Sequence, residues 1–131
     1  MILALVALTS AIAITPADAK PERYEIHATM VQDGKVLFHP RLVANAGETA
    51  AFVTGSGTTN YDLKVIASPD ATHKAGEDGV SLSVDLLVTR QETNRHIIET
   101  VVVKQGEPVT LTLPALESSA PITVNISADR A

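Results

Sequence analysis

The chain has 131 residues, of which 45% are hydrophobic, and this is the size of a single domain with a core of its own. Its formal net charge of −5 argues against a nucleic-acid partner, and an aromatic content of 3% without tryptophan largely excludes stacking platforms for bases or sugars. The absence of cysteine excludes disulfides, thiolate metal sites and cysteine nucleophiles, so stability must come from packing.

Residues 1–19 have the pattern of a secretory signal peptide. An apolar run at residues 2–14 is too short to span a bilayer, and it is followed by the small-x-small cleavage pattern Ala-Asp-Ala at residues 17–19. No Lys or Arg precedes the run, so either the signal is minimal or the true start lies upstream. A buried first strand or helix is the alternative for this segment. We therefore expect an exported protein, periplasmic or secreted, whose mature domain spans residues 20–131 without a stable membrane span.

The mature chain begins with a predicted β-hairpin, residues 23–31 and 35–45, for which two registers are open. A two-residue Asp-Gly turn would mix polar with apolar partners. A three-residue loop with Gly34 in the left-handed conformation instead places Tyr24, Ile26, Ala28 and Met30 opposite Leu42, Pro40, Phe38 and Val36. We favour the three-residue loop, because a slip of one residue would move half of that apolar set into water. Pro40 has no donor for the ladder, so we expect this strand at a sheet edge or bent near Pro40.

The favoured register also predicts a candidate metal site. It places Glu25 opposite Arg41 and His27 opposite His39, with cross-strand Cβ separations of about 5 Å. Two imidazoles and a carboxylate on one wet face are ligands for a divalent cation such as zinc or copper. The alternative is a solvent-exposed polar face that happens to contain two histidines, because the sequence fixes no third strong ligand.

Residues 49–54 and 61–67 predict two further strands. The segment between them, residues 55–60, predicts a short flexible loop, which is too brief for a phosphate-binding loop and lacks its Lys. Residues 68–78 form a polar excursion with Pro, Gly and several charges, and they predict a mobile loop that contains His73.

Residues 79–114 contain three β-like segments separated by polar or Gly-containing turns. The first alternates apolar and polar residues from Val80 to Thr89, and the last, residues 109–113, alternates apolar residues with threonine, so each predicts a strand with one wet face. The middle segment, residues 96–104, is apolar on both faces and predicts a central strand covered on both sides.

The chain closes with a predicted strand at residues 122–126 and a frayed end at residues 128–131. A faint internal echo links residues 43–52 with residues 103–111, since in each a strand ends, a Gly-Glu turn follows and apolar residues alternate. We interpret the echo as one hairpin solution used twice. Together these elements predict an all-β protein, a single antiparallel β-sandwich of about seven strands.

Two segments, PRLVANAGETAAFVTG at residues 40–55 and ETVVVKQGEPVTL at residues 99–111, resemble the C-terminal secretin domain of bacterial secretion and pilus systems. In that family a Pro-Arg-hydrophobic segment leads through a turn into a strand, and a later strand pair ends in a Gly-Glu turn. The resemblance implies a small β-domain of secretin-like pattern. Where the family usually has a Gly-Gly pair, residues 113–115 are Leu-Pro-Ala, and the longer strand set of a gated barrel is missing, so we infer no pore.

The sequence contains no Gly-x-Ser-x-Gly elbow and no histidine in a context that marks a base, so we expect neither catalysis nor a cofactor. Two functions remain open. The first is an exported protein-binding or assembly module that offers an edge strand or a wet sheet face to another periplasmic protein. The second is a small metal-binding or enzymatic domain that uses the face of His27 and His39.

Overall fold

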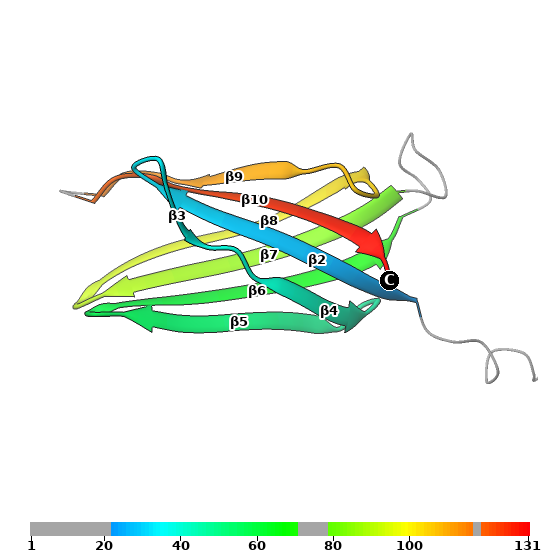
Figure 1. The fold of residues 1–131 in the computed structure, drawn as a ribbon, viewed down its shortest axis with the longest axis horizontal. Coiled ribbons are helices and arrows are strands. Elements are labelled where there is room, and N and C mark those ends of the chain that lie inside the picture. Colours follow the sequence, from blue (N-terminus) through cyan, green and yellow to red (C-terminus); the bar gives the residue numbers. More distant parts are fainter. Residues whose placement is uncertain (1–21, 71–78, 117–118) are drawn as a thin grey trace, which may run out of the picture.

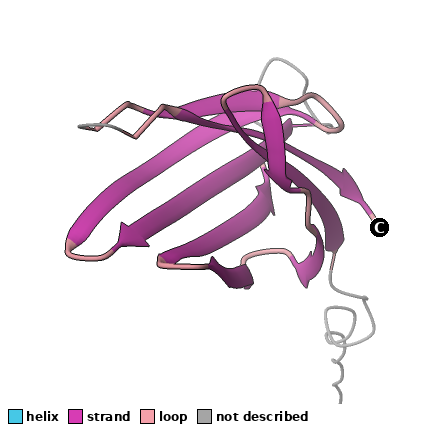
Figure 2. Cartoon of the chain, turned by 60° about the vertical axis from the view of Figure 1, so that its left-hand side comes forward, coloured by secondary structure: helices cyan, strands magenta, loops and turns pink. Residues whose placement is uncertain are grey.

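The computed structural model describes residues 22–70, 79–116 and 119–131, and in these residues the chain forms nine β-strands and no helix. They therefore contain no helical segment that is long and apolar enough to cross a membrane. The strands form two antiparallel sheets that pack face to face (Figure 1, Figure 2). The predicted all-β sandwich is confirmed, with more strands than expected. The predicted signal peptide and His73 lie outside the described residues.

The first sheet contains five strands. In spatial order these are β3 (Lys35–Phe38) and β4 (Arg41–Asn45), which both pair with β2 (Arg23–Gln32), followed by β10 (Ile122–Arg130) and β9 (Val109–Leu113). The second sheet contains four strands in the order β5 (Thr49–Ser56), β6 (Thr59–Pro69), β7 (Gly79–Arg90) and β8 (Thr93–Lys104). The edges of the sandwich are therefore β3 and β4, β9, β5 and β8.

The core lies between the sheets and follows from strict alternation along the interior strands. Every second residue of β2, β6, β7 and β10 is buried, and the buried side chains are Tyr24, Ile26, Ala28 and Met30 of β2, Tyr61, Leu63, Val65 and Ala67 of β6, Val80, Leu82, Val84, Leu86 and Val88 of β7, and Ile122, Val124, Ile126 and Ala128 of β10. No polar or charged residue among the described ones is buried. The interior between the two sheets is therefore formed by packed apolar side chains.

The chain crosses between the sheets at the two Gly-Glu turns of the internal echo. One crossing leads from β4 to β5 and the other from β8 to β9. Gly47 and Gly106 both have a φ of 81°, a conformation that glycine adopts without strain. Each glycine donates its N–H to a strand carbonyl, that of Ala67 at 3.0 Å and that of Ala128 at 2.9 Å. The interpretation of the echo as a repeated hairpin is therefore wrong, because the strands on either side of each turn lie in different sheets; the echo is a crossing between sheets that occurs once in each half of the chain.

The first hairpin does not have the register that we favoured. Gln32 pairs with Lys35, so the turn is the two-residue Asp-Gly alternative, and Asp33 and Gly34 both have the positive φ that a type I′ turn requires. A bulge next to Met30 then shifts the pairing by one residue. Beyond it, Met30 faces Phe38, Ile26 faces Leu42 and Tyr24 faces Ala44. The apolar residues do pair with one another, but a bulge and not a longer loop aligns them.

The expected interruption at Pro40 is confirmed. β3 ends at Phe38 and β4 begins at Arg41, and both strands pair with β2 alone, so this part of the chain is broken and lies at a sheet edge. The carbonyl of Pro40 still accepts a hydrogen bond from the N–H of Ala28 at 3.1 Å. The proline therefore keeps its acceptor in the sheet while its missing donor leaves the strand interrupted.

The prediction that residues 96–104 form a central strand is wrong. They belong to β8, which pairs only with β7 and forms an edge of the second sheet. The chain leaves this sheet at Gly106, so β9 joins the first sheet and does not cover β8 from the side. One face of β8 packs against the core through Ile97, Val101 and Val103. On the opposite face Ile98 is 66% exposed.

Two local predictions also need correction. Residues 55–60 do not form a loop, because β5 extends to Ser56 and β6 starts at Thr59. The predicted frayed end is instead the last part of β10, which continues to Arg130 opposite Tyr24 and buries Ala128 completely. In both cases hydrogen bonding to a neighbouring strand extends the strand into residues of low β-strand propensity.

Two isoleucine substitutions test the position of β8. Ile126→Ala removes a fully buried side chain and should lower the free energy of unfolding by about 2–5 kcal/mol, measured by urea denaturation. Ile98→Ala removes the same atoms from an exposed face and should change it by no more than about 0.5 kcal/mol. Equal costs for the two variants would show that β8 is covered on both faces.

Candidate functional site

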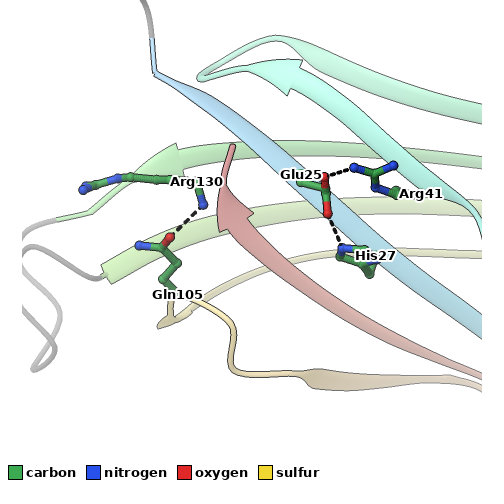
Figure 3. A network of polar contacts seen from close by, with 5 residues as sticks. All are labelled: Glu25, His27, Arg41, Gln105 and Arg130. Atoms are coloured by element: carbon green, nitrogen blue, oxygen red, sulfur yellow. Dashed lines mark hydrogen bonds and ion pairs between the residues drawn. The ribbon is translucent and has the colours of Figure 1, made fainter.

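A polar cluster lies on the outer face of the first sheet at the position where the metal site was predicted (Figure 3). The Glu25 carboxylate accepts hydrogen bonds from Arg41 and, at 2.8 Å through Oε1, from Nε2 of His27. Glu25 pairs with Val43 and His27 with Arg41, so the Glu25–Arg41 contact runs diagonally between β2 and β4. All three residues are within reach of solvent, and the cluster is a surface ion pair extended by one histidine.

His39 does not belong to this cluster. The register places Arg41, not His39, opposite His27, and His39 lies exposed in the break between β3 and β4. The direct pairing of the two histidines is therefore wrong, and with it the geometric basis of the predicted cation site. Within residues 22–70, 79–116 and 119–131, no three His, Cys, Asp or Glu side chains gather closely enough to hold a metal ion.

The charge of Glu25 depends on its neighbours. The Arg41 guanidinium, and after it the His27 imidazole, hold the pKa of the Glu25 carboxyl below its ordinary value of 4.5, and Glu25 in turn raises the pKa of Arg41. Because the folded pKa is lowered, the contribution of this cluster to stability is present above about pH 4.5 and is lost as the pH falls through the folded pKa.

The outer face of the second sheet carries a mixture of apolar and polar side chains. Ile66 and Ile98 line a shallow hollow of about 300 Å³ that reaches Thr49 at the start of β5. Beside the hollow, Nε2 of His96 contacts Oδ1 of Asp85 at 2.6 Å. This face therefore offers apolar contact area interrupted by solvent-exposed polar pairs.

The four edges of the sandwich differ in how they are protected from pairing with another chain. Natural edge strands are protected by shortness, proline, bulges and charged side chains, including charges that point inward. The β3–β4 edge is interrupted at Pro40 and follows a bulge. The β9 strand has five residues and lies between Pro108 and Pro114.

The two edges of the second sheet form a contrast. β8 carries Arg95 and Glu99 on the side that faces the core, as the pairing of Glu99 with the buried Val84 shows. β5, with the sequence TAAFVTGS, contains no charge and no proline, and it pairs with β6 in one unbroken register. Its Val53 is 68% exposed. Among the described edges, β5 therefore lacks all of these protective features.

The edge of β5 is the candidate site, and the sequence analysis did not single it out. A signal was present, since residues 49–56 form an uncharged, β-prone stretch in a chain with 19% charged residues. Whether such a stretch is an edge or an interior strand depends on its partners, and these are visible only in the sheet order.

Comparison of the chain with family models, with curated proteins and with solved structures gave no match. The chemistry of the site must therefore be argued from its own residues.

The surface cluster makes a prediction that NMR can check. In Arg41→Gln the pKa of the Glu25 carboxyl should rise toward its ordinary value, because its strongest partner is lost. A pH titration of the side-chain carboxyl resonance of Glu25 measures it, with the exposed Arg23→Gln as a control for the loss of one positive charge. An unchanged pKa in Arg41→Gln would contradict the diagonal contact.

Proposed function

We propose that the protein is an exported, non-catalytic binding module that accepts an extended segment of another protein at the edge of β5. A strand added to a sheet edge forms main-chain hydrogen bonds with the N–H and C=O groups that the edge leaves unpaired. The observation that carries the proposal is the contrast among edges, because β5 presents the exposed Val53 and contains no charge, proline or bulge.

Charge favours another protein over a second copy of this chain as the occupant. Glu48 directly precedes β5, whereas on β6 the charge of Asp62, opposite the exposed Val53, is offset by Lys64 at 3.9 Å. Two copies of a chain with a net charge of −5 repel each other, whereas a segment with basic residues is attracted to this edge. The proposed partner segment is extended, basic at its flanks and apolar at alternate positions, where its side chains would lie beside those of Ala51 and Val53.

Two parts of the proposal rest on sequence patterns. Export rests on the signal-like residues 1–19, and the assembly role rests on the secretin-like residues 40–55 and 99–111. The first of the secretin-like segments contains β4, the crossing turn and all of β5 except its last residue. The same stretch therefore supports the proposal through its edge geometry and through its resemblance to an assembly domain.

A matched pair of charge substitutions tests the proposal. Val53→Lys places a charge on β5, and Ile98→Lys places one on the other edge of the same sheet, at a side chain with nearly the same exposure of 68% against 66%. Twelve-residue peptides selected from a random display library on the purified protein should bind Val53→Lys at least tenfold more weakly, about 1.4 kcal/mol, and bind Ile98→Lys as they bind the unmodified protein.

The selected peptides should share alternating apolar positions with basic flanks. Failure to select any peptide, or selected peptides that bind Val53→Lys with undiminished affinity, would contradict docking at β5. Sedimentation of the protein alone provides a further check, since a dimer that Val53→Lys dissociates would identify the occupant as a second copy and contradict the choice of partner.

A further inference from the structure

A second feature of the molecule, independent of β5, is a polar end to an otherwise apolar core. The inward-facing positions of β2, β6 and β7 are apolar along most of each strand, and β8 adds Ile97, Val101 and Val103 to the core. At the end of the sandwich that carries the β5–β6 and β7–β8 turns (Figure 1), the inward-facing positions become polar. The inward-facing series there ends at Gln32, Thr59, Arg90, Thr93 and Arg95.

These side chains line a pocket of about 200 Å³ between the two sheets. Gln32 comes from the first sheet, the threonines and arginines come from the second, and Leu116 and Ser119 of the β9–β10 connection complete the wall. Both arginines carry a full positive charge, and no carboxylate is among the residues that line the pocket in the described part of the chain. A chain with 15 acidic and 10 basic residues thus places two guanidinium groups together with no carboxylate among the described residues of the lining.

Hydrogen bonds hold one side of the pocket in place. Nη1 of Arg95 donates to the carbonyls of Pro114 at 3.2 Å and Ala120 at 2.9 Å, and Nε2 of Gln32 donates to the same Ala120 carbonyl at 3.0 Å. These contacts fix the connection after β9 against the second sheet. They involve only one nitrogen of the Arg95 guanidinium, whose five N–H groups form a rigid fork.

Arg90 is the second cation of the pocket, and it makes no hydrogen bond or ion pair with the described residues. It lies opposite Thr93 in the β7–β8 pairing, next to the pair formed by Val88 and Arg95. On the same face, cross-strand and diagonal neighbours are about 5 and 7–8 Å apart at their Cβ atoms, so both guanidinium groups can reach one ligand. Arg95 is thus positioned by the fold, and Arg90 has its donors available.

We propose that this pocket binds a small oxyanion, the carboxylate or phosphate group of a ligand. Arginine pairs recognise both groups through charge-assisted and often bidentate hydrogen bonds, and the threonine hydroxyls and glutamine amides around them supply further donors. The volume of about 200 Å³ suits one acidic group and lies below the roughly 300–1,000 Å³ of pockets that hold drug-sized ligands.

NMR titration of the full chain tests the proposal. Sodium acetate and inorganic phosphate are added separately at constant ionic strength, up to about 10 mM, ten times a dissociation constant of about 1 mM. Saturable shifts of the signals of Gln32, Thr59 and Thr93 are expected with at least one probe, and the probe that binds identifies the group as carboxylate or phosphate. In Arg90→Gln the dissociation constant should rise at least tenfold. Arg90 is exposed and makes no hydrogen bond or ion pair within the described part of the chain, so this variant should fold normally.

Arg23→Gln is the matched control, because it removes one exposed positive charge outside the pocket and should change the dissociation constant less than twofold. Absence of saturable shifts with both probes would overturn the proposal. Binding that Arg90→Gln leaves unchanged would overturn it as well, because the anion would then bind elsewhere. Val53→Lys should leave anion binding intact, so the outcome is distinct from that of the β5 experiment.

Discussion

The pairing of β2 with β10 is the interaction on which the rest of the structure depends. The two strands share nine residue pairs, from Ile122 with Gln32 to Arg130 with Tyr24, and lie side by side in the middle of the first sheet (Figure 1). β3 and β4 pair only with β2, and β9 pairs only with β10, so both edges of this sheet depend on the β2–β10 pair. Because the pair joins the two ends of the described chain, it forms only after long-range loop closure, and such topologies fold slowly.

The distribution of edges follows from the two crossings between sheets. Each Gly-Glu turn connects an edge strand of one sheet with an edge strand of the other, β4 with β5 and β8 with β9. The chain path of the first half, a hairpin in one sheet followed by a hairpin in the other, is repeated with the sheets exchanged in the second half. Equivalent strands in the two halves nevertheless differ. The equivalent of β5 is β9, which has five residues and lies between Pro108 and Pro114, whereas β5 has eight residues and neither charge nor proline.

Much of the fold could be predicted from the sequence, because alternation is a local property. It located the strands and the core faces of β2, β6, β7 and β10. The predictions that were wrong depend on partners far away in the chain. β8 was expected in the centre of a sheet because Ile98 and Val102 are apolar, yet the next strand, β9, belongs to the other sheet and leaves β8 at an edge. In the first hairpin apolar residues face each other as expected, but a bulge beside Met30 and not a longer loop aligns them. The resulting register places Arg41, and not His39, opposite His27. The β5 edge and the two-arginine pocket likewise emerge only from sheet order and register.

Amide hydrogen exchange of the free protein, measured residue by residue along β5 by NMR, tests the central claim most directly. An edge strand directs every second N–H away from its neighbour, so the account predicts alternating fast and slow exchange from Thr49 to Ser56, while the interior strands β2, β6, β7 and β10 stay protected. Uniform slow exchange along β5 would mean that another strand already covers it. Fast exchange throughout β2 and β10 would contradict the pairing that holds the first sheet together.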